Sequence, residues 1–133
     1  RANREQQARQ WAATLDDLEP GAAVVGGDFN TVPPEARQES DFSDEPQTSF
    51  EDDQTLTLLR SVDGLRDAFD PELYRDDESA YFTFPAHDPN RKLDHLLVSE
   101  HFEVVDARVL REAGDVSDHL PLLVRLKLRP PRE

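Results

Sequence analysis

The pattern of apolar and polar residues predicts alternating helices and strands. Across residues 4–18, apolar residues recur every three or four positions, which is one face of an amphipathic helix, with Trp11 expected in the core. Pro20-Gly21 ends this helix, and the apolar, β-branched residues 22–26 follow as a buried strand. A helix that leads directly into a strand favours a mixed α/β layer over a helical bundle.

The C-terminal part of the chain predicts three strands in a meander. Residues 93–99 run out, residues 102–110 return, and residues 120–128 run out again. In the last strand, apolar residues alternate with Arg125 and Lys127, so one face of that strand can meet water.

The middle of the chain is polar and interrupted by prolines. Residues 31–53 predict a long loop that is ordered beside Asn30 and looser further on, with an acidic part at residues 35–53. The acidic part does not match a calcium loop, because the glycine and the distal glutamate of that motif are absent. We interpret it as a solvated loop.

Shorter elements follow this loop. Asp53 is expected to cap a short helix that Asp63-Gly64 closes. Residues 70–79 predict a second charged loop, and the aromatic residues 81–84 predict a brief strand.

Composition limits the class of protein. The 133 residues, 36% of them hydrophobic, suit one small domain, and the absence of cysteine excludes disulfides, zinc–thiolate sites and thiol nucleophiles. No apolar run approaches the roughly 20 residues of a membrane span, so we expect a soluble protein and leave its compartment open. Because the chain lacks methionine and begins with Arg1, we expect it to be part of a longer reading frame.

Polar residues cluster where three of the predicted strands begin or end. Asp28 and Asn30 follow the strand at residues 22–26, Asp94 opens the next apolar run, and Asp118 and His119 precede the last one. One outward and one return strand bring the chain back to the same rim, so Asp94 and His119 should meet there. If residues 22–26 run antiparallel to these strands in the same sheet, Asp28 and Asn30 join them.

These side chains suit the hydrolysis of a phosphoester with the help of a metal ion. A carboxylate that faces an imidazole fixes its tautomer and raises its basicity. Asp118 offers a hard oxygen ligand for Mg²⁺. Asp28 can orient or deprotonate a water molecule, and Asn30 can donate to developing negative charge.

Three motifs carry a family resemblance. Gly26–Asn30, Lys92–Asp94 and Ser117–His119 resemble, in order and spacing, the second half of the endonuclease/exonuclease/phosphatase superfamily, the deoxyribonuclease I-like proteins. The resemblance implies an α/β fold, a four-layer sandwich with two facing sheets. Residues 1–133 would be the C-terminal part of one such domain, with a mixed, mostly antiparallel sheet and flanking helices.

The resemblance also implies roles for single residues. Asp28 and Asn30 would activate water and stabilise the transition state, Asp94 would pair with His119, and His119 would contact the scissile phosphate. Asp118, Asp28 and Asn30 would lie at the metal, Mg²⁺ or Mn²⁺. The substrate would be a phosphoester within a small molecule, a lipid head group or a nucleic acid.

The first half of that family normally supplies an asparagine, a metal-binding glutamate and a second histidine, and nothing before residue 22 matches them. We therefore expect this chain alone to be weakly active or inactive, to have the N-terminal half of the domain as its partner, and to be capable of self-association. A non-catalytic binding module that retains the fold is the alternative function.

Other polar residues have simpler interpretations. His95 is expected to be structural, and His87 to be a solvated loop residue. Arg91 and Lys92 could bind phosphate or form surface ion pairs.

The net charge is −14, from 29 acidic and 15 basic residues, of which only two are lysine. Such a surface argues against non-specific binding of nucleic acid and towards small phosphoesters, although the field inside a cleft can differ from the net charge. The same composition is typical of adaptation to high salt. We predict that the melting temperature rises between low and molar salt, because salt screens the self-repulsion; a constant melting temperature in thermal scans would contradict this.

Overall fold

The computed structural model describes residues 2–17 and 21–130. Its α-helices are α1 (Ala2–Asp17), α2 (Thr55–Arg60) and α3 (Pro71–Asp76), with short 3₁₀ helices η1 (Glu78–Tyr81) and η2 (Arg111–Ala113). Its strands are β1 (Val24–Asp28), β2 (Ser40–Phe42), β3 (Glu45–Ser49), β4 (Leu65–Asp67), β5 (Asp94–Ser99), β6 (Phe102–Val109) and β7 (Leu122–Leu128).

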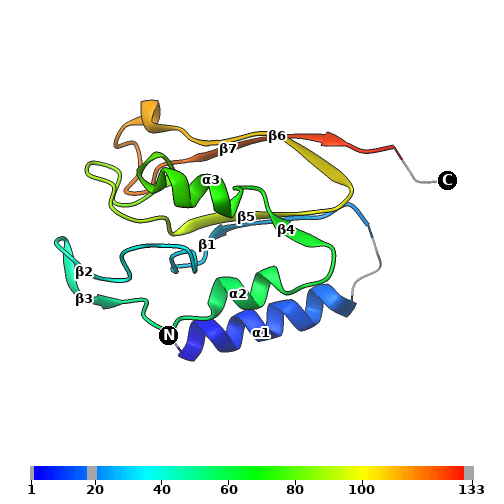
Figure 1. Cartoon of the computed structure of the whole chain (residues 1–133), viewed down its shortest axis with the longest axis horizontal. Helices are drawn as coiled ribbons and strands as arrows, with labels where there is room; N and C mark the ends of the chain where they lie inside the picture. The colour runs from blue at the N-terminus through cyan, green and yellow to red at the C-terminus, as the bar shows by residue number, and fades with distance from the viewer. Residues whose placement is uncertain (1, 18–20, 131–133) are drawn as a thin grey trace.

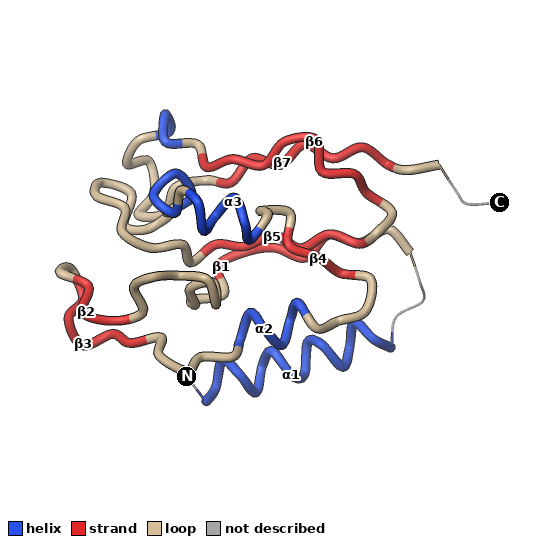
Figure 2. The backbone as a smooth tube through the Cα atoms, viewed as in Figure 1, coloured by secondary structure: helices blue, strands red, loops and turns tan. Residues whose placement is uncertain are grey.

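The described elements form three layers (Figure 1). Helices α1 and α2 lie side by side below a three-stranded sheet of order β1-β5-β4. Above that sheet lies a two-stranded sheet of β6 and β7. A third pair of strands, β2 and β3, extends to the left of these layers as a hairpin (Figure 2).

Strand β5 lies at the centre and is buried on both faces. Successive side chains of a strand point to opposite faces. Leu97 therefore packs with the helical layer, in a cluster with Leu56 of α2, while Val98 packs towards β6 and β7. Both side chains are 0% exposed, which explains why the run at residues 96–98 is apolar without alternation.

The predicted single meander is wrong in its pairing. Strand β5 pairs with β1 and β4, whereas β6 and β7 pair only with each other among the described strands. All of these pairs are antiparallel. Residues 93–99 and 102–110 are thus successive strands of two facing sheets.

The acidic loop predicted at residues 35–53 is also wrong in large part. It contains the hairpin β2–β3, and two of its aromatic side chains, Phe42 and Phe50, are buried against each other. The hairpin depends on a distant residue, because Asp44 and Glu45 both pair with the buried Arg91. Local sequence gives no sign of that contact.

Three smaller corrections concern local structure. The predicted charged loop at residues 70–79 contains α3, whose first turn is capped by the Asp70 carboxylate accepting the Glu72 N–H at 2.8 Å. Residues 81–84 form no strand beyond a single bridge at Phe84. Trp11 is 56% exposed and so is not in the core of the described structure.

Asp53 lies one residue before the N-cap of α2, which is Gln54 and makes no side-chain capping bond, but the Asp53 carboxylate does bind the start of the helix. Its Oδ1 accepts the N–H of Thr55 at 3.0 Å and the Thr55 hydroxyl at 2.6 Å, at the start of α2. The carboxylate also pairs with Arg4 of α1 at 3.0 Å, so it joins the two helices. None of the helices in the described ranges is long and apolar enough to cross a membrane.

Candidate active site

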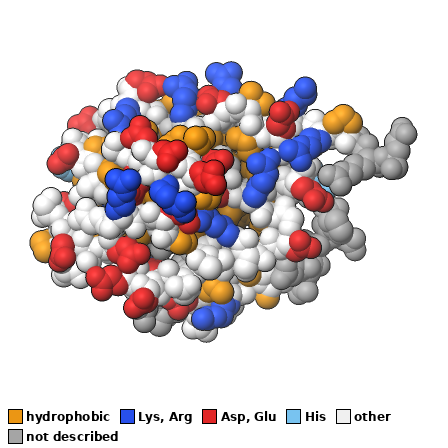
Figure 3. Space-filling view, viewed as in Figure 1, with side chains coloured by type: hydrophobic (Ala, Val, Ile, Leu, Met, Phe, Trp, Pro, Cys, Tyr) orange, Lys and Arg blue, Asp and Glu red, His pale blue; other side chains and the backbone are white. Residues whose placement is uncertain are grey.

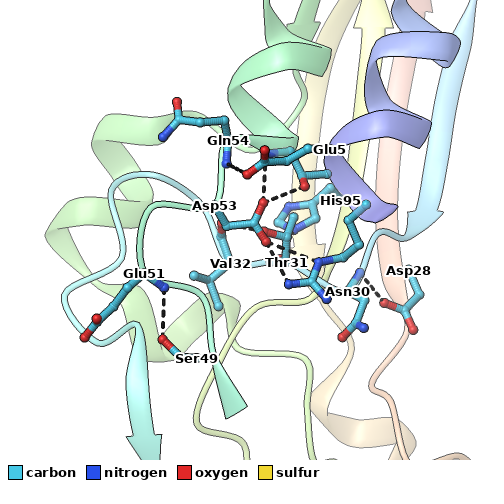
Figure 4. Close-up of polar contacts among 12 residues, drawn as sticks. Glu5, Asp28, Asn30, Thr31, Val32, Ser49, Glu51, Asp53, Gln54 and His95 are labelled. Atoms are coloured by element: carbon cyan, nitrogen blue, oxygen red, sulfur yellow. Dashed lines mark hydrogen bonds and ion pairs between the residues drawn. The ribbon is translucent and has the colours of Figure 1, made fainter. Parts of the chain in front are cut away.

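The end of β1 presents Asp28 and Asn30 on an unusual backbone. Gly27 has φ +144° and Asn30 has φ +49°, conformations that most side chains disfavour and that glycine and asparagine tolerate. The Asn30 N–H donates to Asp28 Oδ1 at 2.8 Å, as Figure 4 shows, so the turn holds the carboxylate that precedes it. The carboxylate and the carboxamide are therefore offered together at one end of the sheet.

The register of β1 and β5 puts two acids opposite each other. Asp28 is the cross-strand partner of Asp94. The His119 ring reaches both: its Nδ1 lies 2.7 Å from Asp94 Oδ2, and its Nε2 lies 3.6 Å from Asp28 Oδ2. The predicted meeting of Asp94 and His119, with Asp28 beside them, is confirmed as geometry.

This arrangement sets the charge of His119. Since an ionised carboxylate only accepts hydrogen bonds, Nδ1–H donates to Asp94. Partial burial lowers the pKa of His119, but the bond to Asp94 and the negative charges of Asp94, Asp28 and Asp118 outweigh it, so the pKa lies above its ordinary value. The imidazole is thus favoured as a cation that faces the cleft.

Three side chains offer ligand atoms for a metal ion. Ligand atoms of Asp28, Asp94 and His119 lie within 4.8 Å of one another, which is the one such group among the histidines and acids of the described residues. The two carboxylate oxygens suit a divalent cation such as Mn²⁺ or Mg²⁺, whereas the imidazole could bind one only through a nitrogen that carries no proton. Asp118, a predicted ligand, is outside this group but lines the same cleft, as does Asn30.

The cleft over these residues has a volume of about 490 Å³. Hairpin β2–β3 supplies part of its wall through Glu45, Thr48 and Ser49, and α1 supplies Arg4. Sequence reasoning missed all four. Arg4 belongs to an ordinary polar helix face, and the hairpin residues were expected to form a loose loop. Nothing in the sequence therefore marked these residues as part of the site.

His95 has the structural place expected of it. It is fully buried, its ring stacks on Phe29 with centroids 6.0 Å apart, and its Nε2 lies 2.7 Å from the carbonyl oxygen of Thr31 (Figure 4). Burial, together with the charges of Lys92 and Arg60, holds the pKa of His95 well below its ordinary value. A neutral His95 therefore contacts both neighbours of Asn30, the ring of Phe29 and the carbonyl oxygen of Thr31.

Neither basic residue of the Arg91-Lys92 pair lies at the surface. Lys92 is buried, its Nζ donates to the backbone carbonyl of Asp94, and it lies 4.2 Å from the centroid of the Phe69 ring. Burial lowers the pKa of Lys92 to about 8 despite the nearby Asp67 and Asp94. Arg91 is buried, but the Asp44 and Glu45 side chains that pair with it are partly exposed. His87 is exposed in its loop, as expected.

The sequence pattern described as the Endonuclease/Exonuclease/phosphatase family matches residues 1–119. The chain belongs to this family. Among curated proteins, none gives a significant match to the sequence.

Two solved structures resemble this family member in fold. One is an endonuclease/exonuclease/phosphatase from Bacteroides vulgatus, with a TM-score of 0.57 and 22% identity; 94% of this chain covers 45% of that one. The other is the mannosyl-6-phosphatase of Bacteroides thetaiotaomicron, with a TM-score of 0.54 and 24% identity over 94% and 46% of the two chains. The chain thus spans less than half of the length of either structure.

A pH titration tests the role of His95 in this family member. A free histidine takes up a proton near pH 6.5, whereas His95 in the folded state resists it. The unfolded state therefore binds more protons below about pH 6.5, so His95 contributes stability that is present above this pH and is lost as pH falls. His119, with its raised pKa, has the opposite sign.

We predict that His95→Gln loses less stability than the wild type between pH 7 and pH 5.5 in urea unfolding. His101→Gln is the control for the loss of one histidine elsewhere in the fold, since His101 is not buried as His95 is. Equal pH slopes for wild type and His95→Gln would show that His95 is protonated in the folded state.

Proposed function

We propose that this chain carries the acid–base and metal-binding side of a divalent-metal-dependent phosphoester hydrolase. The observation that carries the proposal is the His119 ring between Asp94 and Asp28, with His119 and Asp28 lining the cleft. Family membership supports the reaction class.

His119 would hold a phosphoryl oxygen. Its Nδ1 is committed to Asp94, which leaves Nε2, 3.6 Å from Asp28 Oδ2, as the nitrogen that can face substrate. The raised pKa favours the protonated ring, whose Nε2–H donates a charge-assisted hydrogen bond to an anionic oxygen. Asp94 would fix the orientation of the ring throughout.

Asp28 and Asn30 would act on the attacking water. One oxygen of Asp28 accepts the Asn30 N–H, and the other lies on the His119 side, where it can take a proton from water as the oxygen of that water bonds to phosphorus. As the ester P–O bond breaks, the leaving alkoxide takes a proton from solvent water, and Asp28 then releases its own proton to solvent. Asn30 is exposed and can donate its amide N–H to the developing charge.

Asp28, Asn30 and Asp118, which line the same cleft, would hold the metal ion, while Asp94 and His119 stay bonded to each other. A bound divalent ion neutralises phosphoryl oxygens and lowers the pKa of water. Since carboxylate and amide oxygens suit both ions and Mg²⁺ keeps several waters, we propose Mg²⁺ or Mn²⁺ as the cofactor.

A small phosphate ester is the substrate class that we propose. The net charge of −14 disfavours a long polyanion, and on the face in Figure 3 acidic side chains are interspersed among the basic ones. One structure of similar fold is named a mannosyl-6-phosphatase, which makes a sugar phosphate a suitable first substrate to test.

The two similar structures are about twice as long as the part that this chain matches. Turnover would also need groups from the part of the fold that lies outside this match. Strand β1 is an edge strand among the described residues, with Val24 exposed, and Trp11 is exposed beside Gly26 and Gly27. We propose that the other half of the domain covers this edge. An exposed apolar edge of this kind also favours self-association.

Metal binding can be measured on the chain itself. We predict that Mn²⁺, titrated calorimetrically, binds the wild type and that Asp28→Asn weakens the binding by more than about tenfold, since loss of even an indirect ligand partner costs about 10–100-fold. Asp106→Asn is the control, because that exposed carboxylate pairs with Arg108 outside the cleft. Equal Mn²⁺ affinity in all three proteins would contradict the proposed site and favour a non-catalytic module.

Catalysis needs the whole domain. There, His119→Ala should lower the turnover of a phosphate ester by about 10²–10⁴-fold, as expected for a group that handles a proton or charge in the transition state. The initial rate of phosphate release measures this, with His87→Ala as the exposed control histidine. A loss of less than tenfold would remove His119 from the mechanism.

A further inference from the structure

A row of planar groups that includes His119 runs along the cleft. The ring of Phe84 packs against the His119 ring with centroids 4.7 Å apart and the ring planes tilted by 46°. The guanidinium of Arg91 lies 4.7 Å from the Phe84 centroid and 4.6 Å from that of Phe42. Phe42 belongs to β2, so the order Phe42, Arg91, Phe84, His119 runs from the hairpin to the site.

Arg91 is the fixed member of this row. It is 2% exposed, and its two terminal nitrogens bond Asp44 at 3.0 and 3.1 Å and Glu45 at 2.8 Å, at the turn of the hairpin. The guanidinium thus contacts two aromatic rings, and its Nε has no hydrogen-bond partner among the described residues. A planar, always-charged group suits such a position better than an ammonium would.

The backbone ties the same residues together. The Phe84 N–H donates to the Arg91 carbonyl at 3.2 Å, and the neighbouring Thr83 carbonyl accepts the N–H of Leu120 at 2.7 Å. Leu120 directly follows His119 in the chain. The position of the Phe84 ring is therefore set by Arg91 from one side, and the Phe84 segment in turn fixes the chain that carries His119.

We propose that Arg91 is a positioning residue for His119, acting through the ring of Phe84. The bond to Asp94 fixes one edge of the imidazole, but a single hydrogen bond leaves the ring free to tilt about it. The Phe84 ring, which contacts both the Arg91 guanidinium and the imidazole, limits this tilt. Hairpin β2–β3, which walls the cleft, is thereby linked to the histidine that lies in it.

The importance of this link for catalysis rests on the proposed function, but the contacts between Arg91, Phe84 and His119 can be tested without it. NMR is therefore used to measure the position and mobility of the His119 ring, and no enzyme assay is needed. In the wild type we expect a cross-relaxation signal between the His119 and Phe84 rings, and a slowly exchanging, low-field Nδ1–H proton held by Asp94.

Arg91→Met keeps the length and apolar stem of the side chain but removes the planar cation. We expect the signal between the two rings to be lost and exchange of the Nδ1–H proton to quicken by more than about tenfold, as local opening becomes easier. Phe84→Leu keeps an apolar side chain in place but removes the ring face, and should quicken exchange likewise. This second variant decides the question if Arg91→Met does not fold.

Arg60→Met is the matched control. Arg60 also bridges two carboxylates, Glu35 and Asp67, at 2.9 and 2.8 Å, and its Nε also has no partner in the described structure, but it lies outside the cleft. It should lose stability in urea while the His119 signals stay as in the wild type. Unchanged ring contact and Nδ1–H exchange in folded Arg91→Met, or unchanged exchange in Phe84→Leu, would overturn the proposal.

Discussion

Two carboxylates face each other across a strand pair, and the site depends on what lies between them. Asp28 and Asp94 are cross-strand partners, and like charges in that position destabilise a sheet. The His119 ring lies between them, and its positive charge offsets their repulsion. A divalent cation would offset this repulsion more strongly. The repulsion between the paired carboxylates is therefore also the physical basis of the proposed metal binding.

Burial of positive charge is the second constraint on this acidic chain. Arg60 and Arg91 are each held by two carboxylates, and Lys92 lies under a phenyl ring. Buried pairs of this kind add little net stability, because desolvation offsets the attraction, but removal of one partner leaves a stranded charge. Their effect is to fix geometry, because each arginine joins segments that are far apart in the sequence.

The sequence predicted the site correctly where polar side chains directly precede or follow an apolar strand. Asp28, Asp94 and His119 each lie beside an apolar run, so their meeting at one edge of the structure could be predicted, as could the structural place of His95. It was uninformative where a distant partner decides. The polar hairpin at residues 40–49 is held by Arg91, which donates hydrogen bonds to Asp44 and Glu45. These two residues lie 47 and 46 positions before it in the chain.

His119 meets Asp94 although the strands before and after the turn at residues 100–101 do not form one meander. Strands β5 and β6 belong to different sheets, yet His119 still reaches Asp94. An outward strand followed by a return strand brings the chain back to the same end of the fold, whether the two strands pair edge to edge or pack face to face. The face-to-face arrangement places His119 above the edge of the β1–β5 pair, from where one imidazole can reach both carboxylates.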